Sequence, residues 1–547
     1  MIPVSWLHRA GQLQRGRAAR AFLRGADRPR VVQAQRLHEI LTHNRDTVYG
    51  RQHDFASVRS PDDYRRLPLS TPTSHQAWIT RGFAGEAKVL TAEKPVYYVK
   101  TTGSTGPPKY IPITPRYREE FQRALHASMW HLCRRYPRAY SGRVLYFVGS
   151  ASEDVAPNGA TVGTMSGFTF NTLPRVVRAM YAWPQELFTI RDLRTRTLLA
   201  LQLAIQGAPT LCGTIFPISL VLLFRSLAEN ADLLAFHLER GTLPDGLQLT
   251  EDQRRFYQGR VQKRPDRAAG LRQGQKGDLV RHAFPELAMV ICWTGATAGL
   301  YVPELQRWVG EDVLVRDAVY SASEGWMNVP MGDDTPGGPV SVTGHYQEFI
   351  PEADYLAGST DTLGVHELDD GARYAVVLTT SGGLYRYALG DIVEVCGRFR
   401  ALPCIRFVRK VGAACNLAGE KLDETHVNHA VAAALQALGA EASWFCVAPQ
   451  QGAVPSYRLY IEPCTKLPGA EALAAQVDRA LGDVAWDYRA HRQDASLGPL
   501  SVQEVPIGTF SRWRAEQAAA GVAVAQMKAR HLVDDVAAIP APMRASP

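Results

Sequence analysis

A polar, glycine-rich segment between two apolar runs carries the clearest chemical signal in this sequence. It reads TTGSTGPPK over residues 101–109. Glycine reaches backbone conformations closed to other residues, so successive N–H groups can converge on an anion. Hydroxyl groups add hydrogen-bond donors, and a lysine adds positive charge. The segment therefore predicts a polyphosphate-binding loop made by Thr101, Thr102, Gly103, Ser104, Thr105, Gly106 and Lys109.

This loop differs from the P-loop of kinases. The Walker pattern needs G-x-x-x-x-G-K-[ST], with a helix that starts at the lysine. Here two prolines precede Lys109 and the apolar run YIPI follows it. For a single loop of this composition, an ordinary Ser/Thr/Gly turn between strands is the alternative interpretation.

The elements around the loop must hold it in place. Residues 96–99 predict a strand that leads into the loop, and residues 118–136 predict a helix beyond it. Further strands are predicted at 143–148, 287–293 and 374–380, with helical stretches between them. Strands that alternate with helices indicate an α/β architecture.

The pattern changes beyond residue 410. Helices are predicted at 423–438 and 471–481, and strands at 444–448 and 458–461, which together make a compact α+β unit. A chain of 547 residues also exceeds the size at which a single core usually stops growing. We therefore predict two domains, a large one followed by a smaller one.

Composition argues against several classes of protein. The chain is 46% hydrophobic and 21% charged, which is typical of folded domains. Its net charge of +8 is spread along the sequence, which favours mild attraction of anionic ligands over a nucleic-acid arm. Eight cysteines without a C-x-x-C pair favour reduced thiols in the cytoplasm over zinc or disulfides. His426 and His429 have no partner at metal-binding spacing, so we interpret them as a solvated or capped helix face.

Two segments could suggest a membrane. The first 36 residues contain eight arginines and one acid, Asp27, as in a transit peptide or a membrane-surface helix. They have one serine and no apolar core of the cleavage type, which favours a basic helix of the folded domain. Residues 198–224 are uncharged and long enough to cross a bilayer, but Pro209 and Pro217 interrupt them. We expect this run to form buried core, with no contact to membrane or nucleic acid.

Two further motifs follow the loop in order: VYSASEG at 319–325 and LYRYALGD at 384–391. Together the three resemble the signatures of adenylate-forming enzymes, the superfamily of acyl-CoA synthetases, nonribosomal adenylation domains and luciferases. Other stretches resemble one branch, the auxin-responsive Gretchen Hagen family of acyl acid amido synthetases. They include NRDTVYGRQHDF at 44–55, CWTGATAGLYVPELQRWVG at 292–310, GEKLDE at 419–424 and GVAVAQMKAR at 521–530.

The resemblance covers nearly the whole chain and implies its organisation. It implies an α/β fold, in which a large N-terminal adenylate-forming domain with mixed β-sheets and flanking helices precedes a smaller, mobile α+β domain. We expect an ATP- and acyl-substrate-binding domain over 1–395, a hinge over 396–411 and a C-terminal lid domain over 412–547.

The resemblance also implies roles for the later motifs. Glu324 would bind Mg²⁺ as a hard oxygen ligand. Tyr320, Ser321 and Ser323 would border the adenine and the acyl carboxylate. Asp391 would accept hydrogen bonds from the ribose hydroxyls.

Two neighbours of the third motif, Tyr385 and Arg386, are also expected near the nucleotide. For Arg386 two alternatives stay open, a phosphate contact or an ion pair with a carboxylate in the core.

A lysine near the C-terminus would complete the site. Lys528 occupies the position of the family's C-terminal lysine and would stabilise charge at the α-phosphate during adenylation. Because it lies in the smaller domain, catalysis would need closure about Arg409 and Lys410. Lys421 is interpreted as the partner of a nearby acid rather than of phosphate. The acyl pocket is expected to include Met165, Phe168, Tyr301 and Val302.

The resulting hypothesis is an ATP- and Mg²⁺-dependent ligase that adenylates a carboxylic acid and transfers the acyl group to an amine, most simply an amino acid. The first alternative is thioester formation with coenzyme A or a carrier protein. A nucleotide sensor without turnover is a second alternative, and an anion-dependent membrane or nucleic-acid role is a third. We expect a cytoplasmic monomer.

Overall fold

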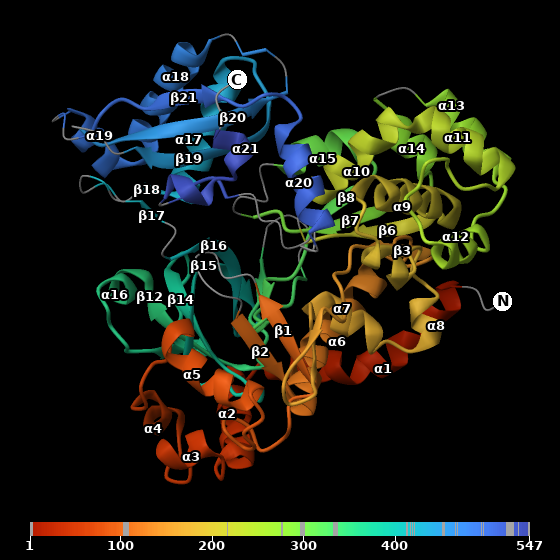
Figure 1. Cartoon of the computed structure of the whole chain (residues 1–547). Coiled ribbons are helices and arrows are strands. Elements are labelled where there is room, and N and C mark those ends of the chain that lie inside the picture. The colour runs from red at the N-terminus through yellow and green to blue at the C-terminus, as the bar shows by residue number, and fades with distance from the viewer. Residues whose placement is uncertain are drawn as a thin grey trace. The chain divides into compact units, whose positions relative to one another are not determined.

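The computed structural model of the chain divides into two compact units (Figure 1). The first comprises Met1–Ile190 and Thr195–Val408, and the second Arg191–Arg194 and Arg409–Pro547. The structure describes all residues except 1–3, 102–108, 216, 275–276, 296–300, 332–336, 412–413, 416, 418–419, 421, 451–453, 465, 468, 494, 496, 521–529, 534 and 545–547.

A six-stranded sheet carries the third motif. Its order is β11-β16-β15-β14-β12-β13, and the strands are β11 (Gly338–Pro339), β12 (Tyr346–Pro351), β13 (Leu363–Gly364), β14 (Arg373–Thr379), β15 (Tyr387–Phe399) and β16 (Leu402–Lys410). The central pairs β12–β14 and β14–β15 are antiparallel. β14 reads RYAVVLT and is buried from its second residue onward, because β-branched and aromatic side chains pack well on both faces of a sheet.

Two four-stranded sheets complete the first unit. One has the order β2-β1-β5-β4, with β1 (Tyr97–Thr101), β2 (Lys109–Ile113), β4 (Asp154–Val155) and β5 (Thr161–Gly163). The other is parallel in the order β3-β6-β7-β8, with β3 (Arg143–Tyr146), β6 (Pro209–Gly213), β7 (Met289–Cys292) and β8 (Leu314–Asp317). A short hairpin of β9 (Ser321–Ala322) and β10 (Gly325–Trp326) follows.

Helices of the first unit cover these sheets. Their bounds are α1 (Val4–Gly25), α2 (Pro29–Asn44), α3 (Val48–Gln52), α4 (Pro61–Arg65), α5 (Pro72–Phe83), α6 (Pro115–Arg135), α7 (Met165–Asn171), α8 (Arg175–Arg178), α9 (Leu193–Gly207), α10 (Pro217–Glu229), α11 (Ala231–Arg240), α12 (Glu251–Gln258), α13 (Pro265–Gln273), α14 (Leu279–Ala283), α15 (Val302–Val309) and α16 (Glu352–Leu356). Ser60, Thr71, Thr114 and Thr250 cap the helices that follow them, since each side chain accepts a hydrogen bond from a backbone N–H of the first turn.

Both segments that could suggest a membrane belong to the folded unit. The basic start forms α1, whose Phe22 is buried in the core, as the sequence predicts. The uncharged run 198–224 forms most of α9, then β6 and the first half of α10. Within the described ranges, none of the helices combines the length and apolar character needed to cross a bilayer.

The second unit is an α+β arrangement, as predicted. β19 (Ala442–Gln450) pairs antiparallel with β20 (Ser456–Pro463), which pairs in parallel with β21 (Ser501–Glu504). The other elements are β17 (Ala414–Cys415), β18 (Leu422–Asp423), α17 (Glu424–Ala437), α18 (Ala470–Val484), α19 (Trp486–Gln493), α20 (Thr509–Ala519) and α21 (Ala541–Arg544). His426 belongs to the capping box at the start of α17, which is the helix role predicted for it.

Candidate active site

The β1–β2 hairpin brings the two ends of the predicted phosphate loop together. Thr101, the last residue of β1, faces Lys109, the first residue of β2, in antiparallel register. Lys109 is half-buried. The side chain of Thr101 lies outside the described part of the chain, as do all of Thr102, Gly103, Ser104, Thr105 and Gly106. Their predicted phosphate contacts therefore stay predictions.

The second motif forms a tight turn. β9 and β10 are antiparallel neighbours joined by Ser323 and Glu324. Tyr117 of α6 donates its hydroxyl proton to the carbonyl oxygen of Ser323 over 2.9 Å. A Cβ atom on Gly325 would lie 2.9 Å from Cδ2 of His345, so only glycine fits behind the turn without a displacement. The turn is therefore held in place from two sides.

The second and third motifs meet at a buried hydrogen bond. Tyr320 donates its hydroxyl proton to Oδ2 of Asp391 over 2.8 Å. Tyr320 is 8% exposed and Asp391 is 6% exposed. Burial raises the pKa of Tyr320 well above its usual value, and the Asp391 carboxylate adds to that rise, so the tyrosine keeps its proton and remains a donor. Two of the predicted nucleotide residues are thus in direct contact.

Glu324 lies among three tyrosines next to this contact. Burial raises the pKa of Tyr117, Tyr320 and Tyr387, and the negative charge of Glu324 raises each of them further. Glu324 itself is half-buried. A partly accessible carboxylate at a fixed turn can bind a hard cation together with other oxygen ligands. Among the described residues, no group of three or more His, Cys, Asp or Glu side chains could hold a metal ion. A cation at Glu324 would therefore need oxygen ligands from the substrate or from water.

One face of α6 connects all three motifs. Thr114, Tyr117 and Glu120 are spaced by three residues, which places them on the same side of the helix start. Thr114 follows β2 directly and donates to the carbonyl oxygen of Ser381, just before the third motif, over 3.0 Å. Tyr117 reaches the second motif at Ser323.

Glu120 continues this face with a buried polar cluster. Its carboxylate accepts hydrogen bonds from the Ser381 hydroxyl at 2.5 Å, the Ser381 N–H at 3.1 Å and Arg36 at 2.5 Å, and it lies 2.9 Å from Nδ1 of His345. Burial acts to raise the pKa of Glu120, but His345 and Arg36 outweigh it and lower the pKa below its usual value. The carboxylate therefore stays charged and joins α2, α6 and the six-stranded sheet.

Tyr385 and Arg386 lie in the core, whereas the sequence suggests nucleotide contacts for both. Tyr385 donates to the carbonyl oxygen of Leu90 over 2.6 Å. Arg386 is 2% exposed, and its Nε lies 3.4 Å from the carboxylate of Glu348. Its remaining donors bond to backbone oxygens and to Thr362. The structure thus shows the core ion pair, one of the two alternatives for Arg386, and both terminal nitrogens of the guanidinium have hydrogen-bond partners.

The residues predicted for the acyl pocket occur as two pairs. Met165 and Phe168 belong to α7, and the ring of Phe168 lies 4.5 Å from that of Tyr97 in β1. Tyr301 and Val302 begin α15, and both are half-buried. Ser321, predicted to border the adenine, is half-buried in β9. These roles stay predictions, since no described contact joins the two pairs.

The second unit carries the remaining candidates. Lys528 and Lys421 fall outside the described residues. Arg409, at the division between the units, lies 3.7 Å from Asp423, and Lys410 ends β16. Residues 396–399 and 402–408 of the predicted hinge continue β15 and β16 of the sheet.

The start of α20, where the sequence reads GTF over residues 508–510, is fixed by a buried acid. The buried carboxylate of Glu462 accepts hydrogen bonds from the N–H groups of Gly508 and Phe510, at 3.1 and 2.6 Å. Acceptors at a helix start satisfy donors that have no partner within the helix. Glu462 therefore fixes the start of α20, the helix that precedes residues 521–529 in the sequence.

Sequence reasoning missed Tyr117, Glu120, His345 and Ser381. The contacts of these residues with one another and with the second motif join positions more than 200 residues apart, as in the 225-residue separation of Glu120 and His345. The sequence did offer one local signal. Thr114 followed by Pro115 is the pattern that starts a helix, and it predicts a helix start just before Tyr117 and Glu120.

Comparisons with known proteins cover most of the chain. Residues 18–314 match the GH3 family N-terminal domain, residues 338–410 the GH3 family central domain, and residues 425–537 the GH3 family C-terminal domain. The solved structure of GH3.15 acyl acid amido synthetase has a TM-score of 0.82 at 20% identity, over 94% of this chain and 93% of the other. The complex of AtGH3.15 with 2,4-DB has a TM-score of 0.83 at 19% identity, over 96% and 95%.

Curated relatives align over most of their length. The probable indole-3-acetic acid-amido synthetase GH3.1 of Arabidopsis thaliana is 25% identical over 544 residues, which cover 92% of this chain and 89% of that protein. The jasmonoyl-L-amino acid synthetase JAR6 of Nicotiana attenuata is 24% identical over 528 residues, which cover 91% and 90%.

The fold is that of a solved acyl acid amido synthetase, and this chain divides into a larger and a smaller unit. The chain belongs to the GH3 family. The predicted fold class and the resemblance to this family are therefore confirmed.

Proposed function

We propose that this protein is an ATP-dependent acyl acid amido synthetase. In the first step a carboxylate oxygen attacks the α-phosphorus of ATP, which forms an acyl-adenylate and releases pyrophosphate. In the second step an amine attacks the acyl carbon, which forms an amide and releases AMP and the proton of the amine. The observation that carries the proposal is the hydrogen bond between Tyr320 and Asp391, because it joins the second and third motifs in one buried site.

The nucleotide would be held by residues of all three motifs, of which Tyr320 and Asp391 are in direct contact. Lys109 and the loop at 101–106 would bind the phosphates by countercharge and hydrogen bonds. Asp391 would accept the ribose hydroxyls, with its carboxylate oriented by the Tyr320 hydroxyl. Tyr320, Ser321 and Ser323 would border the adenine and the acyl group. The residue types suit ATP, because cationic and hydroxyl groups are good partners for phosphates and a carboxylate is a good acceptor for ribose hydroxyls.

Mg²⁺ fits the same site through Glu324. Mg²⁺ commonly binds one or two carboxylates together with substrate phosphates rather than a cage made by protein alone. The half-buried Glu324 supplies one such carboxylate at a fixed turn. When bound, Mg²⁺ would neutralise charge on the phosphates.

The smaller unit would complete the site after substrate binds. We propose that Lys528 stabilises charge on the α-phosphate and acyl oxygen, and that Arg409 and Lys410 lie in the segment about which the C-terminal part closes. The organisation into a domain over 1–395, a hinge over 396–411 and a lid over 412–547 is part of this proposal. The division between Val408 and Arg409 supports it.

The acceptor is proposed to be an amino acid, since the two curated relatives are named amido and amino acid synthetases. Met165, Phe168, Tyr301 and Val302 would contact the acid. We further propose that the protein is a monomer and that it is cytoplasmic; its eight free cysteines support a reducing compartment.

Exchange of labelled pyrophosphate into ATP tests the first step. A panel of carboxylic acids should include some that start the exchange, and the product nucleotide should be AMP. Accumulation of ADP would contradict adenylation. Amino acids and coenzyme A, supplied separately, test the second step, because the true acceptor alone should accelerate AMP release. Acceleration by the thiol would identify a thioester ligase, and tight ATP binding with no AMP over hours would identify a sensor.

A further inference from the structure

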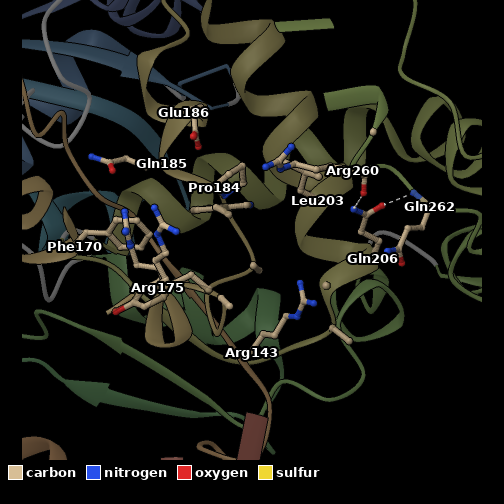
Figure 2. Close-up of a pocket in the computed structure, with 18 of the residues that line it drawn as sticks. Arg143, Phe170, Arg175, Pro184, Gln185, Glu186, Leu203, Gln206, Arg260 and Gln262 are labelled. Atoms are coloured by element: carbon tan, nitrogen blue, oxygen red, sulfur yellow. Dashed lines mark hydrogen bonds between the residues drawn. The ribbon is translucent and has the colours of Figure 1, made fainter. Parts of the chain in front are cut away.

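A second cleft in the first unit is rich in arginine and shares no residue with the candidate active site. It has a volume of about 920 Å³ and is lined by β3, Phe170 at the end of α7, α8, the segment 179–186, the C-terminal end of α9 and the segment 259–264. In Figure 2, Arg143 extends from one side into the cleft, and Gln185 and Glu186 lie on the opposite side. A cavity of this size is typical of small-molecule sites.

The charge of the lining is strongly unbalanced. Five of the described lining residues are arginines, and one is a carboxylate, Glu186; the arginines are Arg143, Arg175, Arg178, Arg260 and Arg264. Arg264 is neutralised by Asp266 through two hydrogen bonds of 2.9 and 2.7 Å. Arg260 donates to the carbonyl oxygen of Phe256 over 3.2 Å and lies over its ring.

The other three arginines carry uncompensated charge. Among the described residues, no carboxylate forms an ion pair with Arg143, Arg175 or Arg178. Elsewhere in the chain arginines commonly have such partners, as in the pairs Arg225–Glu304 and Arg492–Asp478. Like charges in a concave wall raise the local positive potential, which attracts anions.

The backbone holds these arginines in fixed places. Arg143 begins β3 and lies in parallel register with Pro209 of β6. Arg175 and Arg178 are the first and last residues of α8, and side chains three residues apart share one helix face. The cleft stays open at Gly207, where a Cβ would approach that of Ala182 to 3.2 Å. Arg143 and Arg178 are half-buried and Arg175 is exposed, so all three side chains can be reached from solvent.

We propose that this cleft binds a small molecule with two or more phosphate groups. The planar guanidinium fork matches phosphate oxygens in pairs, and several forks at one site select for a multiply charged anion. The volume suits a metabolite rather than a macromolecule. The site would be separate from the loop at 101–109, so its ligand would bind in addition to the reacting ATP.

Calorimetric titration with inorganic pyrophosphate tests the proposal. The full chain would be titrated in EDTA at constant ionic strength, as wild type and as the double variant Arg143→Gln/Arg178→Gln. The matched control is Arg30→Gln/Arg479→Gln, which removes the same charge from exposed positions in α2 and α18. Circular dichroism and the pyrophosphate-exchange rate would show that both variants are folded and that the active site is intact.

The expected result is loss of one class of pyrophosphate sites, with affinity about tenfold weaker or worse in the cleft variant and unchanged in the control. Equal titrations in wild type and cleft variant would overturn the proposal, because all binding would then lie elsewhere. Equal competition by citrate at the same ionic strength would overturn the assignment to phosphate. Retained exchange activity with lost binding would separate this site from the proposed catalytic site.

Discussion

The hydroxyl of Tyr320 and the carboxylate of Asp391 are 71 residues apart in sequence and 2.8 Å apart in the structure. Both side chains are more than nine-tenths buried. A buried carboxylate that accepts a hydrogen bond from a fixed hydroxyl has a defined orientation. The residue proposed to hold the ribose is therefore oriented before a nucleotide arrives.

Removal of this hydroxyl should weaken nucleotide binding. In Tyr320→Phe the ring stays and Asp391 loses a donor, so we expect the KM for ATP to rise about threefold to tenfold and stability to fall by about 1–2 kcal/mol. Pyrophosphate exchange and urea unfolding measure the two effects. Tyr374→Phe is the control, because its hydroxyl accepts a hydrogen bond from the Asp369 N–H in the same core. An unchanged KM in Tyr320→Phe would argue against the proposed role of Asp391.

Glu324→Gln should change the requirement for Mg²⁺. The amide keeps the size of the side chain but loses the charge that would bind the cation. We expect the Mg²⁺ concentration that gives half-maximal exchange to rise about tenfold or more. Glu311→Gln, at an exposed position, is the control. If both variants need the same Mg²⁺ concentration, another residue binds the cation.

Glu120→Gln should destabilise the fold. Loss of the charge removes the buried carboxylate that pairs with Arg36 and leaves it the more exposed Glu39, and one amide cannot accept every hydrogen bond that Glu120 receives. We expect the free energy of unfolding to fall by about 3 kcal/mol. Glu119→Gln, one residue earlier, changes an exposed side chain 3.9 Å from Arg123 and should cost less than about 0.5 kcal/mol. Similar urea midpoints for the two variants would show that the cluster contributes little.

The protein should begin to lose stability at mildly acidic pH, before its carboxylates take up protons. Burial lowers the pKa of His75 to about 4, and the carbonyl oxygen of Gly383 accepts from its Nε2 at 2.7 Å. The unfolded chain takes up a proton near the ordinary histidine pKa of 6.5, whereas folded His75 does not. Stability is therefore lost as pH falls from 6.5 toward 4. His75 alone should remove about 1–2 kcal/mol between pH 6.5 and 5.

A matched pair of variants isolates this effect. His75→Gln should reduce the pH dependence of unfolding by that amount, because glutamine does not titrate. His38→Gln, at an exposed position in α2, should leave the dependence unchanged. Equal slopes for wild type and His75→Gln between pH 5 and 6.5 would contradict the prediction.

Local patterns in the sequence predict the helices and strands well, but they do not predict which residues contact one another. Strands were expected at 287–293 and 374–380, and the structure has Met289–Cys292 and Arg373–Thr379. Apolar runs mark such strands because burial requires them. The helix expected at 118–136 begins earlier, at Pro115, because Thr114 caps it.

Candidate residues could be chosen from the sequence only where they stand inside a recognisable motif. Asp391 and Glu324 are such residues, and their roles stay predictions. Arg386 stands in a motif as well, yet its guanidinium is taken up by Glu348 and by backbone oxygens, partners that no local pattern indicates. Glu120 had no motif, and its three side-chain partners come from three other parts of the chain.

The shared face of α6 has a consequence for protein engineering. Thr114, Tyr117 and Glu120 hold the motifs through contacts that involve neither α7 nor α15, where the predicted acyl-pocket residues lie. Chimeras that exchange α7 or α15 with those of relatives should therefore keep the geometry between Tyr320 and Asp391. The substrate range could then be changed without loss of adenylation activity. Thr114, Tyr117 and Glu120 would keep the motifs in place during such exchanges.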